Sequence, residues 1–237
     1  MAITARDDSC DRDYTAGTVA ATINVQETDL IVVSVGNPIA TVWCTGVTDT
    51  IGNSYTVRTG VINDCSLVFA YCLSSIGSNA GNVITASFNN ADEDGKSIIV
   101  SSWAIDSGDV VTLDGSANKT GGWEASPWET ASDLTTTGTD ELVIACFQAN
   151  ATVTYTNHEI PSGTAADGVL CDPGYGIIGF YRILTETLTN EEAEVDPSAE
   201  NKYSAEVLAF KSEAGGGGIS MPLVMLQHDH FSGGKML

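Results

Sequence analysis

Basic residues are scarce in this sequence. The chain of 237 residues has 9 Lys and Arg against 31 Asp and Glu, which gives a formal net charge of −22 at pH 7. Proteins that bind a nucleic-acid backbone or an anionic membrane surface need clustered Lys and Arg, so we expect neither partner. The acid either keeps a β-rich protein soluble or presents a docking surface for a basic partner or for cations.

Long apolar runs and C-x-x-C motifs are also missing. No run approaches the ~20 apolar residues that a membrane-spanning helix requires. The first residues, MAITARDDSCDRDY, carry charges where a signal peptide has its apolar segment, so we expect synthesis in a cytoplasm without a signal peptide. None of the six cysteines lies in a C-x-x-C pair, which argues against zinc. We expect most of them to be small buried residues, and one long-range disulfide stays open.

Residues for nucleophilic catalysis are few. The three histidines are His158, His228 and His230, and the sequence contains no G-x-S-x-G elbow. His158 ends a Thr-rich run and is interpreted as a rim residue rather than a general base. A glycosidase needs two carboxylates that face each other across a cleft, which a sequence does not reveal. We therefore expect a protein that is not an enzyme.

Oxygen ligands for a cation gather in one short stretch. NNADEDG places Asp92 and Asp94 at alternating positions before Gly95. An EF-hand loop would need Glu at its twelfth position, where Trp103 stands. A charged hairpin turn is the simpler interpretation, so we expect no cofactor, with calcium at Asp92 and Asp94 as the alternative. The histidines of QHDHF are a weaker candidate for a soft metal.

What the sequence has in plenty is β-forming runs between turn residues. Helical periodicity is absent, and Val, Ile, Thr, Phe and Tyr recur in short runs. In NVITASFNN, Ile84, Ala86 and Phe88 share one face and Thr85 and Ser87 the other. We predict an all-β fold, a jelly-roll-like antiparallel β-sandwich with an extended C-terminal arm. The ten clearest runs are 18–26, 29–36, 40–47, 66–74, 82–90, 96–105, 140–149, 151–158, 175–184 and 202–211.

The four tryptophans divide into two pairs. Trp43 and Trp103 lie in predicted strands and are expected in the core. Trp123 and Trp128 lie in a polar stretch, 114–139, that we interpret as a long loop. The sequence shows no internal repeat with a period of about 20–50 residues. Three alternatives stay open for this second pair: stacking on a sugar, contact with a partner subunit, and packing beneath the loop.

The C-terminal stretch is the strongest functional signal. After a predicted last strand come Gly215 to Gly218 and then ISMPLVML. Glycines make a flexible hinge, and an apolar extended segment left in water is an aggregation hazard. We therefore divide the chain into an N-terminal segment (1–14), a sandwich (15–211), a Gly-rich hinge (212–218) and an interaction arm (219–237). The arm's expected docking residues are Ile219, Met221, Leu223, Val224, Met225 and Leu226, with Trp123 and Trp128 as secondary contacts. Folding back onto its own domain is the alternative for the arm.

The order of the runs adds a resemblance. DLIVVSVG, GNSYTV, GNVITASFNN, SIIVSSW, DELVIACF, YGIIGFYRIL and YSAEVLAFK follow one another across residues 15–211. This order resembles a β-sandwich domain of tailed-phage virion proteins and of some bacterial surface proteins. The resemblance rests on strand order and ending, without a catalytic motif. It implies a decoration (cement), tail or fibre role in which terminal arms connect neighbouring subunits. The four-glycine arm is not part of the family pattern.

We expect a non-enzymatic virion structural protein, in the first place a capsid decoration protein that stabilises an assembled lattice. Its expected partners are further copies of the chain, with a trimer as one form, and the major capsid or tail protein of the same virion. The alternatives are a tail or fibre component, a carbohydrate-binding module of the lectin or adhesin type, and a secreted glycosidase-like sandwich.

Overall fold

The computed structural model describes residues 3–14, 16–91, 95–171 and 176–215. Within them the chain is all-β: it forms seventeen strands and no helix, and every strand pair is antiparallel. It follows that these residues contain no helix able to cross a membrane.

Residues 3–105, which we call the first half, form two sheets. Their strands are β1 (Ile3–Asp13), β2 (Thr18–Val25), β3 (Leu30–Asn37), β4 (Cys44–Asp49), β5 (Thr56–Val57), β6 (Val61–Ile62), β7 (Ser66–Cys72), β8 (Asn79–Phe88) and β9 (Lys96–Ile105). Sheet A has the order β1-β9-β3-β7-β5, with β6 also paired to β7. Sheet B has the order β2-β8-β4.

Residues 109–214, the second half, form two more sheets. Their strands are β10 (Asp109–Glu124), β11 (Trp128–Glu129), β12 (Leu142–Ala149), β13 (Tyr155–Glu159), β14 (Gly168–Cys171), β15 (Ile177–Ile183), β16 (Glu194–Pro197) and β17 (Asn201–Ala214). Sheet C has the order β10-β17-β12-β15-β14, and sheet D has the order β11-β16-β13.

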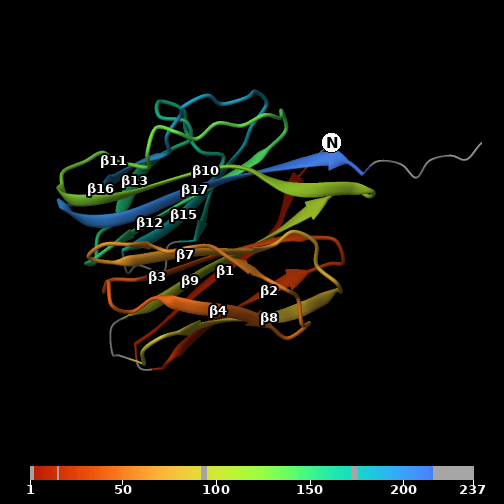
Figure 1. The fold of residues 1–237 in the computed structure, drawn as a ribbon, viewed down its shortest axis with the longest axis horizontal. Helices are drawn as coiled ribbons and strands as arrows, with labels where there is room; N and C mark the ends of the chain where they lie inside the picture. Colours follow the sequence, from red (N-terminus) through yellow and green to blue (C-terminus); the bar gives the residue numbers. More distant parts are fainter. Residues whose placement is uncertain (1–2, 15, 92–94, 172–175, 216–237) are drawn as a thin grey trace, which may run out of the picture.

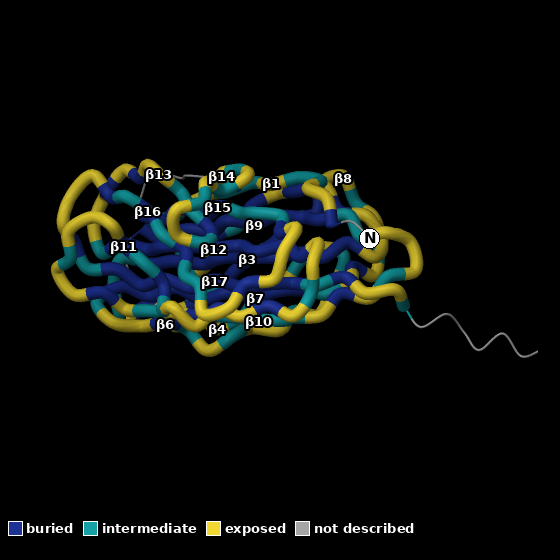
Figure 2. The backbone as a smooth tube through the Cα atoms, turned by 90° about the horizontal axis from the view of Figure 1, so that it is seen from above, coloured by how far each residue is buried: buried dark blue, intermediate teal, exposed yellow. Residues whose placement is uncertain are grey.

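The four sheets stack in the order B, A, C, D (Figure 1). One apolar cluster joins sheet B to sheet A, a second joins A to C, and a third joins C to D. Sheets A and C are therefore covered on both faces, which explains the nearly continuous apolar sequence of β3, β7 and β12. Figure 2 shows the resulting buried band through the middle of the molecule, with exposed turns around it.

The two halves have the same topology. The large sheet contains the order β1-β9-β3-β7 in the first half and β10-β17-β12-β15 in the second. In each half the first strand therefore pairs with the last strand, and the last strand also pairs with the third. The small sheets repeat as well, with β2-β8-β4 matched by β11-β16-β13. Across the A–C interface, β1 lies against β14 and β10 lies against β6. The described residues thus form two units of one strand order that pack through their large sheets.

A β-bulge aligns the two copies residue by residue. In β1 the bulge falls at Arg6, opposite Trp103, and in β10 it falls at Asp114, opposite Phe210. Those two opposite residues also pair with the first residues of β3 and β12, Leu30 and Leu142. Two independent ladders therefore give the same alignment. Arg6 corresponds to Asp114, Trp103 to Phe210, and Leu30 to Leu142.

Each of the ten predicted strand runs overlaps a strand, although some boundaries differ by several residues. The strands missed are short, or they have a polar face. The stretch 114–139, interpreted as a loop, holds most of β10 and all of β11, and the acidic stretch after Leu188 holds β16. β10 was not predicted because it is rich in polar and small residues. Gly115, Gly121 and Gly122 lower its β-propensity further.

Two boundaries differ from the expected ones. Residues 3–13, expected to precede the sandwich, form edge strand β1 of sheet A, and its acidic side chains are a usual protection for an edge. Residues 212–214, expected in the hinge, end β17 and pair with the start of β10. Residue 215 is still attached to the sheet, because its N–H donates to Gly108 O at 2.9 Å.

The buried residues largely follow expectation. Four cysteines, Cys44, Cys65, Cys72 and Cys146, are buried free thiols, and Cys10 is disulfide-bonded. The Trp103 side chain is 1% exposed, as expected for the core. The same expectation for Trp43 is wrong: this side chain is 40% exposed, because the residue precedes β4 rather than lying in it.

Candidate functional site

The expected docking residues of the arm lie outside the described residues. This applies to Ile219, Met221, Leu223, Val224, Met225 and Leu226. The calcium candidates Asp92 and Asp94 also lie outside them. Of the site residues expected from the sequence, the structure describes Trp123 and Trp128.

These two tryptophans have opposite environments. Trp128 is fully buried between sheets C and D, where its ring stacks on Tyr203 with centroids 4.7 Å apart. Its Nε1 donates to Glu124 O at 3.0 Å. Trp128 therefore packs beneath the segment that precedes it and presents no surface to a partner. Trp123 is 64% exposed at the end of β10, with the Lys202 ammonium 6.0 Å from its ring centroid, so it remains a candidate contact.

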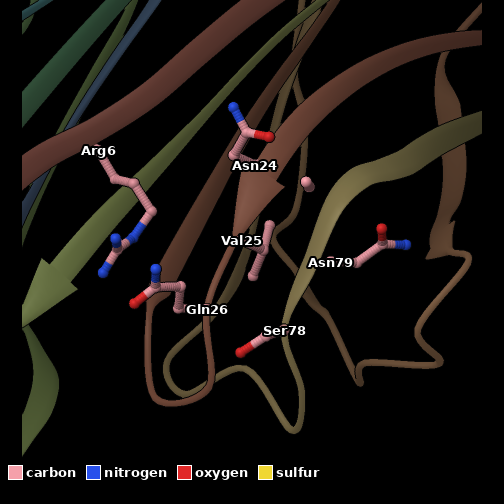
Figure 3. A pocket seen from close by; sticks show the side chains of 7 residues that line it. Arg6, Asn24, Val25, Gln26, Ser78 and Asn79 are labelled. Carbon is pink, nitrogen blue, oxygen red and sulfur yellow. The ribbon is translucent and has the colours of Figure 1, made fainter.

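A groove of about 420 Å³ opens at one corner of the first half, where Val25 and Ala80 lie among polar residues. It is lined by the end of β2, the start of β8 and the bulge residue of β1. Figure 3 shows Val25 between Arg6 and Gln26 on one side and Asn79 on the other. Amide and guanidinium groups of this kind hydrogen-bond to neutral polar ligands such as sugars and peptides.

The corresponding corner of the second half is acidic. Glu129 ends β11, and Glu192 and Glu194 stand at the start of β16. Carboxylate oxygens of these three residues lie within 4.8 Å of one another and are half-buried, so they form a set that could hold a cation. Each already has a protein partner: Lys119 Nζ lies 3.6 Å from Glu129, Ser132 Oγ donates to Glu192, and Ser162 Oγ donates to Glu194.

The two bulges hold equivalent but chemically opposite pairs. In the first half, Arg6 Nε and Nη2 donate to the buried Asp29 carboxylate at 2.5 and 2.9 Å. Asp29 immediately precedes Leu30, and its counterpart before Leu142 is Glu141. The bulge of the second half therefore places one acid, Asp114, beside another, where the first half has an ion pair.

This carboxyl pair has a perturbed protonation equilibrium. The Glu141 side chain is fully buried, and burial together with the neighbouring Asp114 raises the pKa of Glu141 to about 7. Burial also acts to raise the pKa of Asp114, but hydrogen bonds from Thr137 outweigh it and lower that pKa. The ammonium of Lys211 lies 3.3 Å from Asp114. Two acids that share a site in this way retain one proton near neutrality.

Stability should therefore depend on the protonation of Glu141. The folded-state pKa of Glu141 is above the unfolded value. The contribution of its proton to folding stability is therefore complete below about pH 4.5 and is lost as the pH rises through about 7. We expect Glu141→Gln to be more stable than the parent at pH 8.5 by about 2 kcal/mol and to differ little at pH 4.5. Gln still offers Oε1 to the Gly138 N–H. Urea unfolding at both pH values measures this, with the exposed Glu186→Gln as control; equal gains at both pH values would contradict it.

A second buried charge joins the two halves. Arg58, between β5 and β6, donates Nε to Glu206 Oε1 at 2.6 Å and Nη2 to Ser116 Oγ at 3.0 Å. Glu206 lies in β17 with its side chain 1% exposed. Burial raises the pKa of Glu206, and Arg58 opposes that rise. A polar hollow of about 490 Å³ lies beside Arg58, between the edges of sheets A and C.

A third hollow, of about 260 Å³, is mainly apolar and lies at the other end of the A–C interface. Leu73, Ile105, Val110 and Val111 line it together with Thr28, Ser74 and Asp109. Val110 is 54% exposed. This hollow adjoins the place where β17 ends, since Val110 pairs with Glu213 and Asp109 with Ala214.

Sequence reasoning missed both carboxyl groups of the second-half pair and the ion pair between halves. One signal was available: an acid stands immediately before each of the aligned strands, in DLIVVSVG and in DELVIACF. His158, interpreted as a rim residue, is half-buried with its ring 5.2 Å from that of Phe180.

No protein-family model and no curated protein sequence matches this chain.

Proposed function

We propose that this protein is a non-enzymatic structural subunit of a tailed-phage virion, and in particular a capsid decoration protein. Its partners are further copies of the chain, arranged as trimers in one form, and the major capsid protein. A place in the tail or fibre is the neighbouring alternative, with the tail protein as partner. In either location the subunit binds an assembled protein lattice rather than a free subunit.

We also infer that each half is a jelly roll. Strands alternate between a large and a small sheet, and the first and last strands pair in the large one. The short fifth strand departs from the usual arrangement, because β5 and β14 lie at the edge of the large sheet. Jelly rolls are common in viral capsid proteins and in lectins, so this inference is compatible with the proposal and with its main rival.

The observation that carries the proposal is the completeness of the duplicated body. Every strand of the second half has a counterpart in the first, where only the two-residue β6 is additional, and the last described strand ends at Ala214. The apolar segment 219–226 follows this strand in the sequence, and we propose that it makes contacts beyond those within the repeated unit. Six large apolar side chains in a segment of eight residues suit an assembly arm.

The mechanism is mass action. A subunit that binds the assembled lattice and not its free components stabilises the lattice by its binding free energy. Body and arm together form a two-point attachment, and the second contact is strengthened by the high effective concentration of a tethered segment. The charge of −22 opposes nonspecific association between copies in solution.

Virus particles provide the test. Quantitative mass spectrometry of particles purified from the host that carries this gene should find the chain at a fixed copy number. Particles from a deletion strain should rebind the purified chain in a co-sedimentation assay. A chain in which 219–226 is replaced by a Gly-Ser stretch of equal length should bind at least about tenfold more weakly. Absence of the chain from purified particles would reject the proposal.

The rival function is carbohydrate binding, and exposed Trp123 is the observation that favours it. An indole that is 64% exposed offers a face on which a sugar ring can stack. If this rival holds, the chain should bind members of a glycan array, and Trp123→Ala should abolish that binding while deletion of 216–237 leaves it intact.

A further inference from the structure

The apolar hollow at the start of β10 leaves apolar side chains open to solvent. Leu73, Ile105, Val110 and Val111 contribute its apolar lining. β10 is the edge strand of sheet C, so the outer edge of its first residues has no strand partner among the described residues. An open edge beside an apolar hollow is the kind of surface to which an extended segment adds.

The chain leaves the described fold at this same place. Gly215 N donates to Gly108 O at 2.9 Å, and Gly108 turns the chain from β9 into β10. A Cβ at residue 215 would lie 2.2 Å from Gly108 O, so the first of the four glycines is required by the sheet. The remaining linker is Gly216 to Gly218.

We propose that this apolar hollow is the docking site of residues 219–226 of the same chain, which cover it in the free subunit. The inference deepens the proposed function and rests on it in one respect: the arm that is docked on its own body before assembly is the arm that engages the lattice afterwards. Its docking on the body itself does not depend on the virion.

The chemistry of the segment fits the hollow. ISMPLVML contains no charged residue, although the chain has 31 acidic ones, so it meets no like-charge repulsion at Asp109. Met and Leu side chains adapt to shallow apolar surfaces. Pro222 favours an extended backbone at the residue before it, which is the form that adds to a strand edge.

The length of the linker favours the same chain over a second copy. Three extended residues reach about 10 Å, and the hollow begins at Asp109, which pairs with Ala214. Glycine takes either sign of φ, so this short linker can reverse direction. A tether this short gives an effective concentration of about a millimolar or more, far above the concentration of a second copy in a dilute solution.

Hydrogen exchange tests the docking. We compare the full chain with a chain that ends at Gly215, both at low micromolar concentration. Amides in peptides that cover 73–76 and 104–113 should exchange about tenfold more slowly in the full chain. Val110→Asp in the full chain should remove this protection. Val169→Asp, an exposed valine at the opposite edge strand β14, should retain it.

Light scattering separates the possible occupants. We expect both chains to be monomers, and the protection to be independent of concentration. Equal exchange in the two chains would overturn the proposal. Protection that grows with concentration, together with dimers or larger species, would also overturn it in favour of a second copy as the source of the segment. Particle binding is measured separately, so a chain absent from virions but protected at 104–113 would remove the proposed function and leave the docking.

Discussion

Replacement of Trp128 by Ala should destabilise the protein by about 3–5 kcal/mol. The indole is fully buried, stacks on Tyr203 and lies 6.0 Å from the ring of Tyr155. Truncation leaves a cavity between sheets C and D that neighbouring strands cannot fill, because β11 is held by pairing to β16. It also leaves Glu124 O without its indole donor.

Trp123 is the matched control. It has the same side chain at the end of the adjacent strand, but 64% of its surface is exposed, so Trp123→Ala should change the free energy of unfolding by no more than about 0.5 kcal/mol. Thermal and urea unfolding of the two variants measure the difference, with a decrease of roughly 10 °C in Tm expected for Trp128→Ala. Similar losses for both variants would show that Trp128 is not the packed residue that the structure describes.

Removal of Arg58 should be comparably costly. Arg58→Met leaves the Glu206 carboxyl inside the A–C interface without its ion-pair partner, and loss of one member of a buried pair typically costs about 3–5 kcal/mol. The Glu206 Oε2 atom already has no hydrogen-bond partner among the described residues. Urea unfolding of the variant at pH 8 measures the loss.

The pH dependence of this loss identifies its cause. Without Arg58, burial should raise the pKa of Glu206 further above its ordinary value. A raised folded-state pKa gives stability that is present at low pH and lost as the pH rises. The destabilisation should therefore be largest above pH 7 and smaller near pH 4.5, where protonation removes the buried charge.

The duplicated architecture supplies a rescue variant. The residue of β9 that corresponds to Glu206 is Ile99, since each lies four positions before the aligned pair Trp103 and Phe210. Arg58→Met combined with Glu206→Ile should therefore recover most of the lost stability. The surface pair Lys202–Asp64 is the control: Lys202→Met should cost less than about 1 kcal/mol. Failure of the double variant to recover stability would show that the guanidinium packing of Arg58, rather than the charge of Glu206, is what matters.

The positions of most strands depend on residues close together in the sequence, so they could be predicted from it. Alternation in NVITASFNN and the apolar runs of β3, β7, β9 and β12 express a two-residue period and burial on both faces, which depend on neighbouring residues along the chain. The acidic composition likewise stands in the sequence alone. The apolar character of residues 219–226 does so too, and it led to the arm.

The duplication, the buried charges and the fate of the two loop tryptophans were decided by tertiary structure. The halves share strand order and a bulge position, whereas Arg6 faces Asp29 in one and Asp114 faces Glu141 in the other. Trp123 and Trp128 lie five residues apart in the sequence, yet one is exposed and the other is fully buried. Such outcomes depend on which sheet covers a residue and which charge lies across an interface. Those neighbours are distant along the chain, and only the packed sheets bring them together.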